Sequence, residues 1–422
     1  MVWVYSALLA LAALASLPFV VVFSLRDADL RRHWGERLGG LPVFPAARRP
    51  IWVHAASVGE VAASQRILRE LEEISPGIPI LLSSTTPAGR RLAIKSVETG
   101  SRASFFPLDL GFIMRRSLAR VRPRALVLIE TEIWPNLLRE CSRARIPVVL
   151  VNGRISERSF RRYRRIRPLV AGALQRLELF AMQTEGDAGR IRALGAPPER
   201  TRVLGNVKWD LAAERGSAAE ARRRIGWPAE APVLVAGSTS EGEEEILLQS
   251  WARLRSEFPQ LRFVLAPRHP HRFERVATLL AGKGVLFARR SAGEARDAPL
   301  LLLDTIGELA RLYAAATICF VGGSLVPRGG QNLMEPAAAG RPVLFGPRTE
   351  NFAAAAQALI EAGAGFRVSG AESLEEAIRR LLRDPAACER AGERAIAVVE
   401  RNRGAARRSA EAIAGILARA DR

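Results

Sequence analysis

Cysteine, histidine and lysine are all scarce in this sequence. Its 422 residues include three cysteines and four histidines, and almost all of the 63 basic residues are arginine. Cys141, Cys319 and Cys388 stand far apart and match no metal-ligand spacing. An odd number of scattered cysteines indicates a reducing compartment and no structural metal. With 48% hydrophobic and 25% charged residues, the chain is not an intrinsically disordered one.

Acidic residues are too few to balance the arginines, so the formal net charge is +20. Part of this excess is typical of an arginine-rich and alanine-rich genome, and part favours an anionic partner. The densest cluster, RRYRRIR at 161–167, contains one tyrosine and lies in no recognisable RNA-binding motif. Anionic lipid or a phosphorylated substrate is therefore a better expectation than nucleic acid.

Charged side chains are absent from residues 2–25, VWVYSALLALAALASLPFVVVFSL. About 20 apolar helical residues suffice to cross a bilayer core, so this segment is predicted to be a membrane anchor. The alternative, a cleaved signal peptide, usually has a basic start and a shorter apolar stretch. Basic residues follow the segment at once, from Arg26 onward, and none precedes it. The positive-inside rule then keeps the remainder of the chain in the cytoplasm.

Short apolar runs alternate with helix-length amphipathic stretches after the anchor, as parallel βαβ units require. The first series of expected strands comprises residues 51–55, 78–85, 125–132, 146–153 and 179–184. The second series comprises residues 232–239, 262–268, 284–289, 300–305, 318–324 and 342–347. The sequence therefore predicts an α/β protein of two doubly wound domains.

The domain junction is expected in the alanine-rich and charged interval that begins at residue 212 and contains Gly226 and Pro228. The predicted parts are an anchor at 1–25, an N-terminal domain at 26–211, a linker at 212–230, a C-terminal domain at 231–395 and a helical tail at 396–422. Ligands of doubly wound sheets collect beyond the carboxyl ends of the strands, so the turns that follow the strands are the places to look for chemistry.

In the second domain, the turn at 322–330 is rich in glycine and precedes an expected helix near Asn332. Glycine permits close backbone approach, and helical N–H groups there favour an anion. Glu335 has two interpretations: it completes a capping box with Asn332, or its carboxylate accepts hydrogen bonds from ribose hydroxyls.

Other turns of the second domain carry further polar residues. Arg268, after a strand, has the planar donors that clamp a phosphate. His269 and His271 lie two residues apart in a proline-containing turn without nearby carboxylates or cysteines, which is a poor metal site. The DTIGEL stretch at 304–309 either caps a helix or brings backbone amides to a base or sugar.

In the first domain, HAASVGE at 54–60 lies where an apolar strand gives way to a helical pattern. Ser57 and Glu60 have the spacing of a capping box, so Glu60 is either a helix cap or a reactive acid. Glu130 and Glu132 follow another apolar strand. A buried carboxylate needs a partner, and structural pairing is the commoner role of such acids.

Eight sequence blocks together resemble one family. They are WVHAASVGE, ETEIWPN, NGRISERS, GNVKWD, STSEGEE, PRHPHRF, DTIGEL and VGGSLVPRGGQNLMEPAAAGRPVLFGP. Their order and spacing are similar to those of the 3-deoxy-D-manno-octulosonic-acid (Kdo) transferases, over nearly the whole chain. The resemblance implies a GT-B glycosyltransferase, with two Rossmann-like doubly wound domains facing a cleft and an N-terminal membrane-anchor helix.

The resemblance also implies the reaction and its partners. Kdo would pass from CMP-Kdo to a lipid A precursor, with inversion, at the cytoplasmic face of the bacterial inner membrane, without a cofactor or metal. Residues 26–211 would bind the acceptor and residues 231–395 the CMP-sugar. Glu60 would be the general base, with Glu130 and Glu132 as supporting candidates.

The residues implied at the donor site belong to the second domain. They are Ser238, Thr239, Arg268, His269, Gly307, Glu308, Leu309, Gly322, Gly323, Ser324, Gln331, Asn332 and Glu335. The candidates for an acceptor or membrane face are Ser57, Arg161, Arg162, Arg164, Arg165 and Lys208. The family often has histidine at the positions of Ser240 and Gln331, which puts an imidazole contribution in doubt here.

Two other functions fit parts of the sequence. One is a membrane-associated GT-B enzyme that uses a nucleotide diphosphate sugar. Such an enzyme would have similar glycine turns and a glutamate at the position of Glu335. The other is a non-catalytic, basic, membrane-tethered binding protein.

Overall fold

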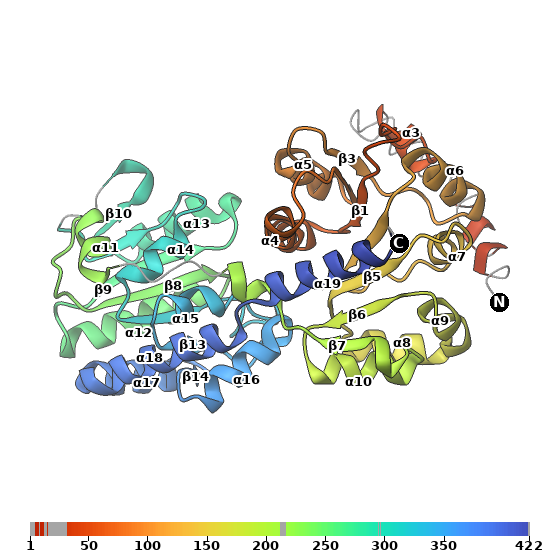
Figure 1. The fold of residues 1–422 in the computed structure, drawn as a ribbon. Helices are drawn as coiled ribbons and strands as arrows, with labels where there is room; N and C mark the ends of the chain where they lie inside the picture. The colour runs from red at the N-terminus through yellow and green to blue at the C-terminus, as the bar shows by residue number, and fades with distance from the viewer. Residues whose placement is uncertain are drawn as a thin grey trace. The chain divides into compact units, whose positions relative to one another are not determined.

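The structure, a computed structural model, describes residues 5–7, 9–11, 15, 32–211, 217–293, 295 and 297–420. The chain divides into two compact units. Unit 1 contains residues 1–211 and 403–422, and unit 2 contains residues 212–402. Each is a parallel α/β unit (Figure 1).

The described residues of unit 1 form a seven-stranded parallel sheet with the order β3-β2-β1-β4-β5-β6-β7. Its strands are β1 (Ile51–His54), β2 (Ile80–Ser84), β3 (Arg102–Phe105), β4 (Ala125–Ile129), β5 (Val148–Gly153), β6 (Leu179–Met182) and β7 (Thr201–Val203). The central strands are buried on both faces, as expected for a parallel sheet covered by helices.

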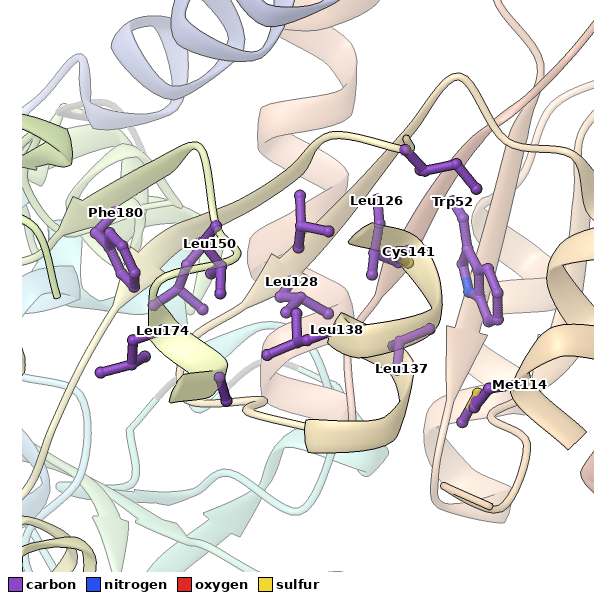
Figure 2. Packing of buried hydrophobic residues seen from close by; sticks show 14 of the residues in the cluster. Trp52, Met114, Leu126, Leu128, Leu137, Leu138, Cys141, Leu150, Leu174 and Phe180 are labelled. Atoms are coloured by element: carbon purple, nitrogen blue, oxygen red, sulfur yellow. The ribbon is translucent and has the colours of Figure 1, made fainter. Parts of the chain in front are cut away.

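Helices cover both faces of this sheet. They are α4 (Val58–Ile74), α5 (Pro87–Ser96), α6 (Gly111–Val121), α7 (Pro135–Arg143), α8 (Glu157–Arg165), α9 (Arg167–Leu174), α10 (Glu185–Leu194) and α19 (Ala405–Ala420). On one face, side chains such as Trp52, Leu128, Leu138 and Phe180 form a continuous core (Figure 2). On the other, α4 packs against α19, and Ile413 and Leu417 join the core.

The last helix thus returns the chain to unit 1. Asp210 holds its beginning, because its two carboxylate oxygens accept the backbone N–H groups of Gly404 and Ala406 at 2.6 and 2.7 Å. The segment 396–422, which the sequence sets apart as one tail, is therefore divided. Its first part belongs to α18 (Pro385–Asn402) of unit 2, and the rest is α19 of unit 1.

The described residues of unit 2 repeat this architecture with the strand order β10-β11-β9-β8-β12-β13-β14. The strands are β8 (Val233–Thr239), β9 (Arg262–Pro267), β10 (Phe287–Arg289), β11 (Leu300–Leu302), β12 (Ile318–Val321), β13 (Val343–Phe345) and β14 (Gly365–Arg367). The covering helices include α11 (Ala218–Arg224), α12 (Glu243–Glu257), α13 (Phe273–Gly282), α14 (Leu309–Leu312), α15 (Met334–Ala338), α16 (Ala353–Glu361), α17 (Ala371–Arg383) and α18.

The two sheets confirm the predicted pair of doubly wound parallel domains, and each has one central place where the direction of winding changes. In unit 1 it lies between β1 and β4, and in unit 2 between β8 and β12. The carboxyl ends of strands at such a switch point are the usual ligand site of an open α/β sheet.

The predicted anchor at residues 2–25 lies mostly outside the described residues. In the part of the chain that is described, no helix is long and apolar enough to cross a membrane. Two of its described residues contact unit 1: the Tyr5 hydroxyl donates to Asp109 Oδ2 at 3.0 Å, and the Ser6 hydroxyl donates to Asn136 Oδ1 at 2.8 Å.

Candidate active site

Glu60 lies in the first turn of α4, immediately after the switch-point strand β1. Its backbone N–H donates to the Ser57 hydroxyl oxygen at 3.4 Å, and its Oε2 accepts the Ala56 N–H at 2.8 Å. The Ser57 hydroxyl donates to Glu60 Oε1 at 2.9 Å. The spacing of Ser57 and Glu60 therefore produces the predicted capping arrangement. Because Glu60 remains partly exposed, capping does not withdraw its carboxylate from solvent.

The surroundings of Glu60 raise its pKa to about 7. Burial is the largest cause, and the nearby negative charges of Glu130 and Glu132 act in the same direction. The hydrogen bonds from Ala56 and Ser57 oppose the shift. A carboxylate with a pKa close to neutrality is a much better proton acceptor than an ordinary glutamate, and it is still ionised in a large fraction of molecules at neutral pH.

Glu130 follows β4 and adopts a positive φ of 61°, which is uncommon for a residue other than glycine. Its Oε1 lies 3.9 Å from Nζ of Lys208, and both side chains are about a quarter exposed or less. Lys208 belongs to a short 3-10 helix, Val207–Leu211, that packs against α4. The fold thus brings a lysine from the GNVKWD block to Glu130, the acid that follows β4.

Glu132 is held by residues that the sequence reasoning did not single out. Its Oε2 accepts the Trp134 indole N–H at 2.9 Å and lies 3.4 Å from His54 Nε2. The His54 ring is fully buried and stacks on Phe106, with ring centroids 3.8 Å apart. A histidine at the end of an otherwise apolar strand was the available signal for this cluster, because a buried polar side chain requires a partner.

In unit 2, the glycine turn after β12 is joined to the turn after β8. The backbone N–H groups of Gly323 and Ser324 donate to the carboxylate of Glu243, the first residue of α12. The Ser324 hydroxyl donates to Val321 O and accepts the Gly346 N–H. The Thr239 hydroxyl donates to Glu244 Oε1 at 2.8 Å. The hydroxyls of Thr239 and Ser324 were predicted to bind the CMP-sugar. Both residues are buried, and both hydroxyls form hydrogen bonds within the protein.

Arg268, Gln331 and Glu335 gather at the same edge of the second sheet. Arg268 Nε donates to Gln331 Oε1 at 3.2 Å, and Asn332 Nδ2 donates to Glu335 Oε1 at 2.9 Å. Burial raises the pKa of Glu335, while Asn332 and the charge of Arg268 oppose the shift. The helix α15 begins at Met334, and its first N–H donates to Asn332 Oδ1 at 3.0 Å. Asn332 therefore serves both Glu335 and the helix start.

Comparisons with known proteins identify the family of this chain. Residues 32–211 match the family model described as 3-Deoxy-D-manno-octulosonic-acid transferase (kdotransferase). The chain is 35% identical to a 3-deoxy-D-manno-octulosonic acid transferase of Haemophilus influenzae, over 96% of each chain. It is 38% identical to a Bordetella pertussis protein of the same name, over 89% of each chain. The chain belongs to the Kdo transferase family.

A solved structure supports the fold assignment of this Kdo transferase. The Anabaena protein HepE in complex with UDP matches with a TM-score of 0.59, covering 87% of this chain and all of that chain. At 14% identity, the likeness concerns the fold alone. Family membership makes the protein a glycosyltransferase of lipopolysaccharide synthesis, and it decides against a non-catalytic binding protein.

The remaining donor-site candidates of the Kdo transferase lie at other turns of unit 2. Ser238 and Gly307 have positive φ values of 55° and 90°. The Glu308 carboxylate accepts Arg290 Nε at 2.9 Å and the Thr305 hydroxyl at 2.5 Å, and these contacts lower its pKa. Leu309 begins α14. Glu308 is thus tied to its own loop, which fixes the backbone around Gly307.

His269 is exposed and stacks on His271, with ring centroids 5.4 Å apart. Partial desolvation and the charge of Arg268 lower its pKa. In the described ranges, no group of three or more histidine, cysteine, aspartate or glutamate residues has the geometry to hold a metal ion.

The arginine cluster occupies helix α8 of unit 1. Arg161, Arg162, Arg164 and Arg165 are all exposed, and Arg161 lies 3.8 Å from the equally exposed Glu157. The helix packs against α9 and α10. Its arginines form a solvated basic surface, whereas Lys208 lies with the acids near Glu60.

Proposed function

We propose that this Kdo transferase moves Kdo from CMP-Kdo to a lipid A precursor, with Glu60 as the general base. The observation that carries the proposal is the raised pKa of Glu60, about 7, at the switch point of unit 1. The names of the Haemophilus and Bordetella relatives support the transferred sugar.

The proposed reaction is a single displacement with inversion. An acceptor hydroxyl oxygen bonds to the anomeric carbon of Kdo while the bond from that carbon to the phosphate oxygen of CMP breaks. The electron pair of the broken bond leaves with the CMP phosphate, and the hydroxyl proton passes to the Glu60 carboxylate. Glu60 then returns the proton to solvent. Both steps suit a carboxylate whose pKa lies near the working pH.

In this proposal unit 2 holds the donor. Gln331 engages Arg268 through Nε, and the terminal amino groups of the guanidinium supply donors for the departing phosphate. Glu335, oriented by Asn332, accepts hydrogen bonds from ribose hydroxyls. The backbone around Ser238 and Gly307 lies against the nucleotide in this proposal.

We further propose that the enzyme works at the cytoplasmic face of the inner membrane. Residues 2–25 carry no charged side chain and would anchor it there. The exposed arginines of α8 would face anionic lipid, each contributing roughly 1 kcal/mol near the surface.

Glu60→Gln tests the base, with Glu73→Gln as the matched control. Glutamine can still accept the Ala56 N–H through its amide oxygen, and Glu73 is an exposed acid on the same helix. Product would be measured by mass spectrometry after incubation with CMP-Kdo and a lipid A precursor. We expect kcat to fall by about 10²–10⁴-fold in Glu60→Gln, and Glu73→Gln to behave like wild type.

Donor binding is measured separately, as the thermal stabilisation of each variant by CMP. It should be unchanged in Glu60→Gln. Turnover of folded Glu60→Gln within a few fold of wild type would overturn the assignment of the base. Wild-type turnover should also fall as the pH drops through about 7, where Glu60 takes up its proton.

A further inference from the structure

Glu243 is a fully buried acid whose carboxylate accepts hydrogen bonds from four backbone N–H groups. Its side chain is 0% exposed. Oε2 accepts the N–H groups of Ser240 and Gly323 at 2.8 and 2.7 Å, and Oε1 accepts those of Ser324 and Leu325 at 3.0 and 2.9 Å. Four well-formed donors satisfy a buried carboxylate without a counter-cation.

The donors at 323–325 form the kind of concavity that binds anions. Gly323 has a φ of 66°, and the three successive N–H groups converge on one carboxylate. Nests of this kind commonly cradle phosphates. Here the concavity is filled by an anion of the protein itself, and a second anion cannot share the same donors without strong repulsion.

Gly322 has an internal reason to be glycine. A Cβ at this position would lie 2.6 Å from Ser238 O, 2.6 Å from Thr239 Cα and 2.8 Å from Glu243 Oε2. The glycine therefore permits the two turns to approach each other around the carboxylate. The packing of the two turns is enough to explain why residue 322 is glycine, without the close approach of a ligand.

We infer that Glu243 is a positioning residue of the donor site and that its carboxylate, not the donor phosphate, occupies the amide nest at 323–325. The inference rests on the proposed use of CMP-Kdo. It leaves Arg268 and its neighbours to bind the phosphate, and it gives the glycine turn a different role from the one that its sequence predicts.

The carboxylate can act on the donor site through the backbone. It joins Ser240, in the turn that follows Ser238 and the end of β8, to the turn that begins at Gly322. Gly323 O in turn accepts the Gly330 N–H at 2.8 Å. Gly330 directly precedes Gln331, whose side chain holds Arg268. Loss of the Glu243 charge should therefore displace the residues that hold the nucleotide.

The test compares Glu243→Gln with Glu245→Gln. Glu245 is exposed and lies in the same first turn of α12, so the control removes an identical charge outside the nest. We expect the KM for CMP-Kdo to rise at least about tenfold in Glu243→Gln, and the KM for the lipid acceptor to stay within about twofold. A variant that only lowered the folded fraction would reduce kcat and change neither KM.

Chemical complementation sharpens this test. In Glu243→Ala the four N–H groups lose their acceptor, and formate is small enough to replace the missing carboxylate. Formate should lower the donor KM of Glu243→Ala and leave those of wild type and Glu245→Gln unchanged. If neither Glu243 variant folds without formate, its addition should restore the folded state.

An unchanged donor KM in folded Glu243→Gln, or no effect of formate on Glu243→Ala, would overturn the inference. Failure of the proposed function looks different, because wild type and Glu245→Gln would then transfer no Kdo from CMP-Kdo at all. In that case the nest would still be tested by the thermal stabilisation that CMP gives to each variant.

Discussion

Glu60 and Glu243 occupy corresponding places in the two sheets, yet their environments are opposite. Each lies in the first turn of the helix that follows a switch-point strand, β1 in unit 1 and β8 in unit 2. Within the described part of the chain, the Glu60 carboxylate accepts hydrogen bonds from Ala56 and Ser57, just before its helix, and Glu60 stays partly exposed. Glu243 reaches the turn after the neighbouring strand and is fully buried.

The two environments suit the two acids to different tasks. Glu60 has two hydrogen-bond donors and two acids, Glu130 and Glu132, nearby, and the net result is a pKa of about 7. Glu243 has four donors that hold both oxygens. A carboxylate whose acceptor sites are fully used stabilises a fold, whereas one that is partly solvated and crowded by like charge is suited to proton transfer.

Alanine substitution should separate the two acids most strongly. Glu243→Ala leaves buried N–H groups without an acceptor, each at a cost of roughly 1–3 kcal/mol, so unit 2 should lose at least about 3 kcal/mol. Glu60→Ala removes the acceptor of the Ala56 N–H and of the Ser57 hydroxyl but leaves the Ser57 cap in place, so the loss should be about 1 kcal/mol. Calorimetric unfolding of both variants measures the contrast. Equal losses would show that the two carboxylates contribute alike.

Alanine at the neighbouring glycines gives a second contrast. Gly322→Ala forces a Cβ against the backbone of Ser238 and Thr239 and should destabilise the protein by about 2 kcal/mol or more. At Gly59, in the first turn of α4, a Cβ meets only Ser57 Oγ, at 4.0 Å. Gly59→Ala should therefore stabilise the protein by about 0.4–1 kcal/mol. The melting temperatures should shift in opposite directions, and a shift of both in the same direction would contradict the packing argument.

Ser57→Ala should make Glu60 a stronger base and α4 a weaker helix. It removes the cap, at a cost of about 1 kcal/mol, and one of the hydrogen bonds that hold the pKa of Glu60 down. The acid limb of kcat/KM for the acceptor should move to higher pH. Ser156→Ala is the matched control, because the Ser156 hydroxyl caps α8 by accepting the Ser159 N–H at 3.1 Å, and it should leave that limb in place.

A pH-dependent gain in stability is expected in Glu60→Gln. Folding raises the pKa of Glu60 from its usual value of 4.5 to about 7, so between these pH values the folded protein binds more protons than the unfolded chain. The free energy of unfolding of the wild type therefore decreases as pH rises through this window. Glutamine removes this dependence, and the difference in Tm between Glu60→Gln and wild type should be larger at pH 8 than at pH 5. A difference independent of pH would place the pKa of Glu60 elsewhere.

The sequence predicted the central strands of both sheets but not all of the outer ones. Strands such as β1, β4 and β8 are buried on both faces and therefore appear as continuous apolar runs. The runs RASF, TRV and GFR, which form β3, β7 and β14 at sheet edges, are three or four residues long and mixed in polarity. Their pairing depends on a neighbour that is already in place, and no local pattern records it.

The candidate site shows a similar limit. The capping relation of Ser57 and Glu60 is local and was visible from a spacing of three residues. The contacts of Glu243 with the turn after β12 join residues about 80 positions apart, and the pairing of His54 with Glu132 depends on the register of β1 against β4. The sequence indicated which turns carry polar groups. The hydrogen-bond partners of Glu132 and Glu243 could be identified only from the structure.

The return of α19 to unit 1 makes unit 2 an insertion within unit 1. Ile413 and Leu417 help to cover α4, and the Asp210 carboxylate accepts the N–H groups of residues 404 and 406. Residues 32–211 therefore do not cover all of their own apolar surface. A helix that follows unit 2 in the chain covers it, so removal of α19 should destabilise the sheet of unit 1.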